Sequence, residues 1–308
     1  MTHAIETADL SRRFRRQEAV HALTLQVPAG SIFALVGPNG AGKTTTIKML
    51  MNLLRPTGGR ASVLGTDSRR LGAAEYQRIG YVSENQELPD WMTPDELLAY
   101  VRPFYPTWDE ALCGHLRREL ALDTATRLSR LSRGTRMKAA LLSSLAYRPE
   151  LLVLDEPFTG LDPLVRDELV RALLELPGDR PFTAVISSHD IDEVERLADW
   201  IGFLDRGRLA FAEPVGALLA RFRLVEVVMP DAPPPLRALP ARWLVHGVAG
   251  RTLRLVDTGH ASADPAAELA SAWPGADIRV SPLSLREIFV ALARESARPG
   301  TAGGEGAS

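Results

Sequence analysis

The chain has 308 residues, which is enough for about two domains of ordinary size. Hydrophobic residues make up 45% of it, enough for a well-buried core. The 36 basic and 38 acidic residues leave a net charge of −2, so no global field points to nucleic acid, and we expect no nucleic-acid partner.

Two features that the sequence lacks bear on where the protein works. Cys113 is the single cysteine, which excludes an intramolecular disulfide and favours a reducing compartment. The N-terminus has no secretory signal, and no apolar run reaches the roughly 18–20 residues that span a bilayer. We therefore expect a cytoplasmic protein that reaches a membrane only through a partner.

The first strong signal along the chain is a glycine-rich loop at residues 37–44, GPNGAGKT, which fits the pattern G-x-x-x-x-G-K-[ST]. It follows an apolar run at 31–36 that is typical of a buried strand, and a helical pattern begins at about Thr44. Glycines let successive N–H groups surround an anion, and the helix N-terminus adds donors. An ordinary glycine-rich turn is the alternative, but the full pattern between a strand and a helix favours a nucleoside triphosphate site.

In such a loop the lysine, here Lys43, reaches the β- and γ-phosphates, and the hydroxyl of Thr44 can ligate magnesium. The residues of this loop that we expect to bind the nucleotide are Asn39, Gly40, Ala41, Gly42, Lys43, Thr44 and Thr45.

Residues 86–147 are predicted to be helical. Thr93 to Glu96 (TPDE) and Thr107 to Glu110 (TWDE) both fit the capping box S/T-x-x-E, which marks a helix start. The segment also holds LSRGT at 131–135, a polar turn before an apolar helical pattern. This turn offers no strong nucleophile, metal ligand or general base. Aromatic residues flank the first helix and form either core or a groove for a partner's helix: Trp91, Phe104 and Tyr105.

Two acidic residues directly follow the apolar run at 151–154. Asp155 stands at the end of this predicted strand, where it can hold magnesium directly or through water. Glu156 comes next and can polarise a water aimed at the γ-phosphate. Adjacent acids in a loop are usually surface residues, but the aliphatic run and the upstream loop favour the functional interpretation. Asp162 and Pro163 fit a helix N-cap and first helical residue.

A third predicted strand, in FTAVISSHD at 182–190, leads into His189. A lone histidine is more often structural. The carboxyl ends of strands are where α/β sheets bind ligands, and this position favours contact of the imidazole with a γ-phosphate.

These motifs, in this order, resemble those of the ATP-binding subunit of an ABC transporter over about residues 3–220. The matching segments are GPNGAGKT, LSRGT in place of the family's signature (commonly LSGGQ), LLVLDEP, TGLD and SSHD. The resemblance implies an α/β fold, a P-loop NTPase core of the ABC ATPase type at 1–220 with a helical subdomain inserted at about 86–147. It also implies ATP and Mg²⁺ as ligands and hydrolysis of ATP, with Lys43, Glu156 and His189 in catalytic roles.

The resemblance further implies partners. Two such subunits pack head to tail, so Ser132 and Gly134 would bind the γ-phosphate of ATP held by the other chain, which is either a second copy or a related subunit. The helical subdomain would meet integral membrane (permease) subunits, which places the chain on the cytoplasmic face of the cell membrane. LVGPNGAGKTTTIKML is similar to the ABC-2 exporter type, so the expected activity is ATP hydrolysis that energises export.

The chain departs from the family pattern at several positions. Arg133 replaces the middle glycine of the signature and is expected to point to solvent, and Thr135 replaces its glutamine. Glu84, in YVSENQ, stands where the family has a glutamine that senses magnesium. We expect Glu84 to contact the nucleotide and to ligate Mg²⁺ with Thr44 and Asp155, although its charge puts the usual attack geometry in doubt. Phe14 is expected to stack on adenine, with an edge-strand core position as the alternative.

Residues 221–296 are predicted to form a small α+β accessory domain, and such tails occur on ABC-2 exporter subunits. The runs RLVEVVM, RWLVHGV, TLRLVD and DIRV predict strands, and 265–272 a helix. A proline-rich connection, MPDAPPPLRALP, interrupts them, and the tail at 297–308 is expected to be disordered. One side of the last helix is predicted to carry Leu285, Ile288, Phe289 and Leu292.

Two other functions remain to be weighed within the family. A ribosome-associated factor carries two cassettes in one chain and a DNA-repair clamp carries long coiled coil, and this sequence has neither. A regulatory subunit with weak turnover fits the altered signature and Glu84. The intact Glu156 and His189 argue against it.

Overall fold

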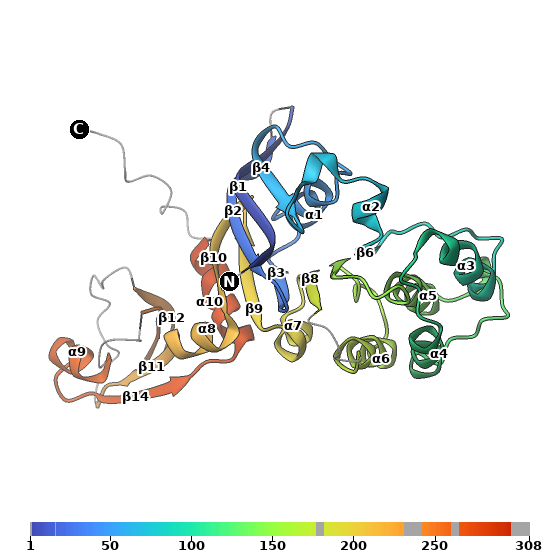
Figure 1. Cartoon of the computed structure of the whole chain (residues 1–308). Helices are drawn as coiled ribbons and strands as arrows, with labels where there is room; N and C mark the ends of the chain where they lie inside the picture. Colours follow the sequence, from blue (N-terminus) through green and yellow to red (C-terminus); the bar gives the residue numbers. More distant parts are fainter. Residues whose placement is uncertain (1, 16, 177–181, 231–241, 260–264, 297–308) are drawn as a thin grey trace. The chain divides into compact units, whose positions relative to one another are not determined.

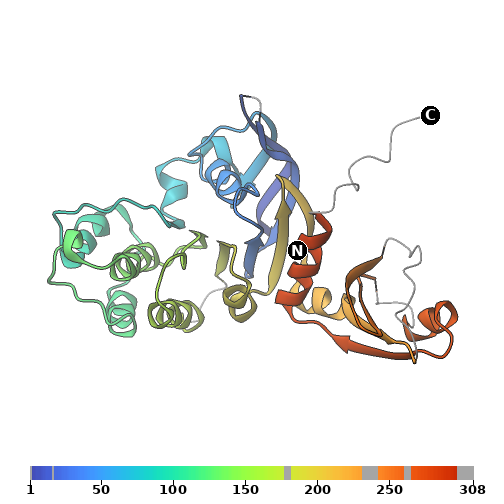
Figure 2. The same cartoon turned by 180° about the vertical axis from the view of Figure 1, so that it is seen from behind.

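The computed structural model describes residues 2–15, 17–176, 182–230, 242–259 and 265–296. The chain divides into two compact units, 1–212 and 213–308, which are drawn from opposite sides in Figures 1 and 2. The division falls before the boundary expected at 220, because the short helix that follows residue 214 belongs to the second unit.

The centre of the first unit is a six-stranded sheet with the order β10-β9-β3-β8-β7-β6. β3 pairs in parallel with β8 and β9, and β7 pairs in parallel with β6 and β8. All residues of β7 and β8 are buried, as apolar runs covered on both faces should be, and the three predicted strands are confirmed. The strands are β3 (Ile32–Val36), β6 (Ile79–Ser83), β7 (Leu151–Asp155), β8 (Thr183–Ser188), β9 (Trp200–Asp205) and β10 (Arg208–Pro214).

An antiparallel sheet with the order β2-β1-β4-β5 completes the first unit. Between the sheets lies α1 (Lys43–Leu50), which contacts β2, β4 and β7 and buries Ile47 and Leu50 in their common core. The strands are β1 (His3–Phe14), β2 (Gln17–Pro28), β4 (Gly58–Val63) and β5 (Thr66–Asp67), and two short helices follow them, η1 (Ser68–Arg70) and α2 (Ala73–Tyr76).

The remaining helices of the first unit gather beyond the β6 edge of the central sheet and below β8, with α3, α4 and α5 forming a cluster (Figures 1 and 2). They are α3 (Pro94–Val101), η2 (Arg102–Phe104), α4 (Glu110–Glu119), η3 (Leu128–Arg130), α5 (Arg133–Leu145), α6 (Pro163–Leu174) and α7 (Ile191–Leu197). Their apolar faces share one core with β7 and β8. Within the described parts of the chain, no helix combines the length and apolar character that crossing a bilayer requires.

The capping predictions have mixed outcomes. The Thr93–Glu96 box is confirmed, as is the Asp162 cap with Pro163 as the first residue of α6. The box at Thr107 to Glu110 is wrong, because Asp109 caps α4 by accepting from the Leu112 N–H at 2.9 Å. The Thr107 hydroxyl instead donates to the carbonyl of Tyr147 at 2.6 Å. A carboxylate one residue before the helix has taken the position that the pattern assigned to the hydroxyl.

The second unit contains an antiparallel sheet with the order β12-β13-β11-β14 and its own buried core, which includes Trp243 and Trp273. The predicted strands and both predicted helices are confirmed, and Leu285, Ile288 and Phe289 are buried. Residues 231–240 of the proline-rich connection and the tail at 297–308 lie outside the described residues. The elements are α8 (Val215–Arg221), β11 (Arg223–Val228), β12 (Trp243–Ala249), β13 (Thr252–Asp257), α9 (Pro265–Ala272), β14 (Asp277–Pro282) and α10 (Leu285–Ser296).

A chain that ends after Pro214 should fold and keep its nucleotide affinity, because the first unit retains every strand described for it and the two hydrophobic cores that its described residues form. Circular dichroism would establish folding, and calorimetric titration with Mg·ATP would measure binding in the truncated and full-length chains. A folded truncation that no longer binds nucleotide would show that the second unit completes the site.

Candidate functional site

Four parallel strands of the central sheet end at the same edge and deliver the predicted site residues there. β3 leads into the glycine-rich loop, β6 into Glu84, β7 into Asp155 and Glu156, and β8 into His189. The register sets Asp155 directly between β6 and β8, opposite Ser187 on the latter. This edge is the usual ligand position of parallel sheets.

A pocket of about 430 Å³ opens at this edge. It brings together every predicted residue of the glycine-rich loop with Glu84, Glu156 and His189. Its lining consists of Ala19, Asn39, Gly40, Ala41, Gly42, Lys43, Thr44, Thr45, Glu84, Glu156, Thr159 and His189. Sequence reasoning missed Ala19, which has no polar side chain to signal a role, and Thr159, which stands at the start of TGLD.

The glycine-rich loop is held closely against the surrounding backbone. A Cβ atom at Gly37 would lie 2.1 Å from the carbonyl oxygen of Leu204 on β9, so no other residue fits there. Gly42 caps α1 with a left-handed φ of 106°. The Ala41 carbonyl accepts a hydrogen bond of 2.9 Å from the Gly207 N–H in the β9–β10 turn. Since α1 begins at Lys43, its first N–H groups and the positive end of its dipole lie at the pocket and suit an anion.

The three predicted catalytic side chains form one connected group. Lys43 Nζ lies 3.0 Å from Glu156 Oε1, and His189 Nδ1 lies 2.7 Å from Glu156 Oε2. The Thr159 hydroxyl donates to the same Oε2 at 3.1 Å. The Lys43 and Glu156 side chains are only 5% and 11% exposed. Glu156 has a left-handed φ of 52°, a strained conformation for a non-glycine residue of a kind that clusters at functional sites.

The environment of Glu156 favours its charged form. Burial by itself would raise the pKa of this carboxyl, but the hydrogen bond with His189 and the charge of Lys43 outweigh it and lower the pKa below its ordinary value. The opposite holds for Asp155, since burial raises its pKa more than the hydrogen bonds from Ser187 and Thr44 lower it. A divalent cation beside Asp155 would favour its charged form.

Asp155 and Thr44 offer an oxygen pair that fits Mg²⁺. The Thr44 hydroxyl donates to Asp155 Oδ1 at 3.0 Å, and Mg²⁺ prefers one or two carboxylates combined with waters and substrate phosphates. Ser187 fixes the same carboxylate, donating to Oδ1 at 2.7 Å and accepting from the Glu156 N–H at 2.9 Å. Sequence reasoning gave no role to Ser187, which stands two residues before His189. The observation that reveals its role is the pairing of β8 with β7, which sets Ser187 opposite Asp155.

Three of the predicted nucleotide contacts lie outside this pocket's lining. Phe14, at the end of β1, is 43% exposed, and the Arg12 guanidinium lies 4.5 Å from its ring centroid. Ser132 caps α5 by accepting from the Thr135 N–H at 3.2 Å. Gly134 packs on Val165, where an added Cβ would lie 3.0 Å from a methyl group. Stacking by Phe14 and binding of a second chain's nucleotide by Ser132 and Gly134 stay predictions.

Arg133 does not simply point to solvent. Its guanidinium donates to Glu84 Oε1 at 2.7 Å, so two of the residues that depart from the family pattern form an ion pair within the chain. Arg133 is exposed, with 46% of its side chain open to solvent, but the expectation missed its pairing with Glu84 because it considered the signature turn alone.

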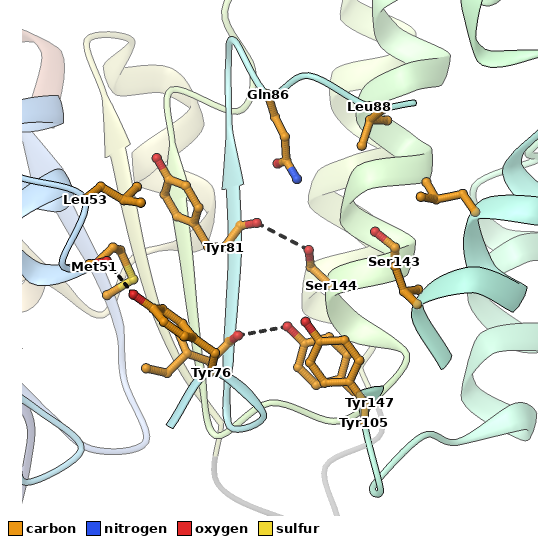
Figure 3. A pocket seen from close by; sticks show the side chains of 13 residues that line it. Met51, Leu53, Tyr76, Tyr81, Gln86, Leu88, Tyr105, Ser143, Ser144 and Tyr147 are labelled. Atoms are coloured by element: carbon orange, nitrogen blue, oxygen red, sulfur yellow. Dashed lines mark hydrogen bonds between the residues drawn. The ribbon is translucent and has the colours of Figure 1, made fainter. Parts of the chain in front are cut away.

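A second pocket, of about 280 Å³, lies between the sheets and the helical cluster (Figure 3). Tyr105 stacks on Tyr147 with ring centroids 3.7 Å apart, and the Tyr147 hydroxyl donates to the Ile79 carbonyl at 2.8 Å. Tyr81 of β6 and Gln86 of the loop beyond it also line this pocket (Figure 3). Tyr105 is thus packed as a wall of a pocket, whereas Trp91 and Phe104 are exposed.

Comparison with known proteins decides the family. Residues 20–159 match the family model described as "ABC transporter". The chain is 36% identical over 225 residues to the daunorubicin/doxorubicin resistance ATP-binding protein DrrA of Streptomyces peucetius, covering 70% of this chain and 67% of DrrA. It is 32% identical over 225 residues to the bacitracin transport ATP-binding protein BcrA of Bacillus licheniformis, covering 72% of this chain and 74% of BcrA. The chain belongs to the ABC transporter ATP-binding family.

Other ABC proteins show how wide the likeness is. The sulfate/thiosulfate import ATP-binding protein CysA of Yersinia pseudotuberculosis is 33% identical over 215 residues, covering 67% of this chain and 59% of CysA. A solved ATP-binding subunit of an ABC transporter superposes with a TM-score of 0.63 at 28% identity, over 70% of this chain and 92% of that one. The dimeric cassette MJ0796 superposes with a TM-score of 0.62 at 20% identity, over 68% and 98%. The first unit is therefore an ABC ATPase cassette with a P-loop NTPase core.

Replacing Lys43 with methionine should lower the affinity for Mg·ATP at least about tenfold, because the change removes the buried cation of the pocket and keeps the length of the side chain. Isothermal titration calorimetry would measure the affinity. Lys48→Met is the matched control, because Lys48 is exposed on the same helix and does not line the pocket. Equal affinities in the two variants would contradict the assignment of Lys43.

Proposed function

We propose that this ABC ATPase hydrolyses Mg·ATP in the pocket at the edge of the central sheet and drives export through separate membrane subunits. The observation that carries the proposal is the connected Lys43–Glu156–His189 group beside the glycine-rich loop, in which Lys43 and Glu156 are nearly buried and His189 is exposed. It combines a cation for the phosphates, a carboxylate with a lowered pKa and an imidazole at one place.

Each side chain has a separate task in this reaction. Thr44 and Asp155 hold Mg²⁺, which neutralises the phosphate oxygens when it is bound. Lys43 attracts the β- and γ-phosphates, and the glycine-rich loop directs its N–H groups to them. Glu156, whose charged form is favoured by His189 and Lys43, orients and deprotonates the attacking water. His189 holds Oε2 of Glu156 and contacts the γ-phosphate, and Ser187 holds both acids in register.

The names of two relatives support export. BcrA is named for bacitracin transport and DrrA for daunorubicin/doxorubicin resistance, and outward movement of a drug accounts for resistance. CysA is named for import, so membership of the family alone does not give the direction. Of these three, DrrA has the highest identity to this chain, and its name is the main support for an exported cargo.

The pocket of Figure 3 suits a partner's helix. It is lined on one side by Tyr81 of β6 and on the other by Tyr105 and Tyr147, so a segment inserted there contacts both the sheet and the helical cluster. The exposed side chains of Tyr100 and Phe104 pack edge to face nearby, with ring centroids 5.7 Å apart. Docking of integral membrane subunits at this pocket would keep the chain on the cytoplasmic face of the membrane.

Two chains would form composite sites, with Ser132 and Gly134 of one chain at the γ-phosphate held by the other. Supporting this arrangement, Ser132 is exposed at the N-terminus of α5 and does not line its own chain's pocket. A helix N-terminus of this kind binds anions well. The related fold of MJ0796 has been solved as a dimer.

Glu156→Gln should keep ATP binding and lower turnover by about 10²- to 10⁴-fold, the usual contribution of a general base. Phosphate release and calorimetric ATP affinity would be measured on the same preparation. Glu195→Gln, an exposed glutamate on α7, is the control. Turnover at the wild-type rate in Glu156→Gln would remove Glu156 from the reaction.

A mixed dimer tests whether Ser132 acts in trans. Ser132→Asp keeps a good N-cap but adds an anion near the γ-phosphate, and Ser132→Asn keeps the cap without charge. One chain carries Ser132→Asp and the other Lys43→Met, both with Glu156→Gln so that bound ATP is retained. The mixed dimer then has one sound site and should trap about one ATP, far more than either homodimer.

If the signature turn instead served its own chain, both sites of the mixed dimer would carry a lesion. Trapping at the homodimer level, with Ser132→Asn dimers trapping normally, would therefore contradict the composite site.

A further inference from the structure

Glu84 and Arg133 come from distant parts of the chain and meet beside the nucleotide pocket. Glu84 follows β6, Arg133 is the first residue of α5, and the two are joined by a charge-assisted hydrogen bond of 2.7 Å. The family pattern has a glutamine at the first position and a glycine at the second, so two neutral residues are replaced by a pair of opposite charges. The structure gives these two departures a common explanation.

Glu84 lines two neighbouring pockets. It lines the nucleotide pocket with Lys43 and His189, and it also lines a neighbouring pocket of about 360 Å³ with Arg133 and Arg136. Its backbone N–H is fixed to the Asp155 carbonyl at 2.9 Å. The backbone of Glu84 is therefore fixed to the end of β7. Its side chain can still turn either to Arg133 or to the nucleotide pocket.

Arg133 also contacts the loop that follows Glu156. A Cβ atom at Gly160 would lie 2.9 Å from Arg133 Nη1, so the guanidinium occupies the space that this glycine leaves open. Arg133 thus links three segments of the first unit: the signature turn at 131–135, the loop after β6 and the TGLD loop. Because Arg133 itself belongs to the signature turn, a change in its pairing with Glu84 directly alters the contacts of the turn that a second chain would use.

We propose that the Glu84–Arg133 ion pair is a nucleotide-sensitive link between the signature turn and the nucleotide pocket of the same chain. The proposal rests on the proposed binding of Mg·ATP in that pocket. The cation of Mg·ATP attracts the Glu84 carboxylate and weakens its bond to Arg133, which loosens the signature turn before a second chain docks. The pair is partly exposed, at 29% for Glu84 and 46% for Arg133, and such pairs are weak enough for a divalent cation to compete with.

The same geometry predicts an effect whose sign depends on the cation. With Mg²⁺ present, Arg133 competes with the cation for Glu84 and opposes nucleotide binding. Without a divalent cation, the negative charge of Glu84 repels the phosphates, and Arg133 reduces that repulsion by pairing with it. A residue that merely supported the fold would not change the sign of its effect on affinity when Mg²⁺ is removed.

The test measures the affinity for the non-hydrolysable analogue AMP-PNP, with Mg²⁺ and then with EDTA at equal ionic strength, at concentrations where sedimentation shows monomers. Arg133→Gln should bind Mg·AMP-PNP about twofold to fivefold more tightly than wild type does. It should bind metal-free AMP-PNP more weakly than wild type, by a similar factor. Arg133→Lys keeps the cation and should stay close to wild type. In a Glu84→Gln chain, Arg133→Gln should change neither affinity.

Arg136→Gln is the matched control. Arg136 lies three residues further along α5, lines the same neighbouring pocket and pairs with Asp90 at 2.6 Å, but it does not line the nucleotide pocket. Its removal should leave both affinities unchanged. Amide hydrogen exchange gives a second readout, since Mg·AMP-PNP should accelerate exchange at 132–137 in wild type and not in Glu84→Gln.

The outcomes separate this proposal from the proposed function. An Arg133→Gln effect with the same sign in Mg²⁺ and in EDTA, or one that persists in the Glu84→Gln chain, would overturn the link while leaving nucleotide binding intact. Absence of any AMP-PNP binding by wild type would overturn the proposed function itself.

Discussion

The charges of Lys43 and Glu156 face one another inside the protein, and much of the first unit follows from the need to hold them there. Burying two opposite charges is costly unless their geometry is good and their remaining polar atoms are bonded. Lys43 meets this condition through the Gly37 carbonyl at 2.7 Å, and Glu156 meets it through His189 and Thr159. Lys43 follows the loop that leaves β3, and Glu156 follows β7 directly. Both strands pair with β8, so the two charges meet only when β3, β7 and β8 are in register.

The parts of the site that could be predicted are those where local sequence and chemistry coincide. The apolar runs before Gly37 and Asp155 are buried strands, and the loop pattern at 37–44 specifies a turn that few other sequences can form. Once the strands are known to be parallel, the meeting of the loop, the two acids and His189 follows, since carboxyl ends of parallel strands share an edge. The fold of the cassette was predictable for the same reason, and so were the strands of the second unit, whose alternating runs match a half-covered sheet.

The parts that could not be predicted depend on side chains that meet only in three dimensions. Nothing near Arg133 indicates Glu84, because 48 residues separate them along the chain and their pairing needs α5 beside the end of β6. Ser187 was hidden for the same reason, since its role comes from the Asp155 carboxylate across the β7–β8 pair. For the start of α4 the sequence offers two N-caps, Thr107 and Asp109. The Thr107 hydroxyl is instead taken by the Tyr147 carbonyl, which lies just beyond the C-terminal end of α5, so the sequence around Thr107 could not decide between the caps.

The contact of Gly37 with β9 has a consequence for the thermodynamics of binding. The loop backbone is pressed against the Leu204 carbonyl and bonded through Ala41 to the β9–β10 turn, so its freedom has largely been lost on folding. A mobile loop of the same composition would have to lose that conformational entropy each time a ligand bound, at about 1–2 kcal/mol for each ordered residue. Here the loop is ordered once, when the protein folds. The free energy of the interaction between the N–H groups and an anion is therefore hardly reduced by any further loss of loop entropy on binding.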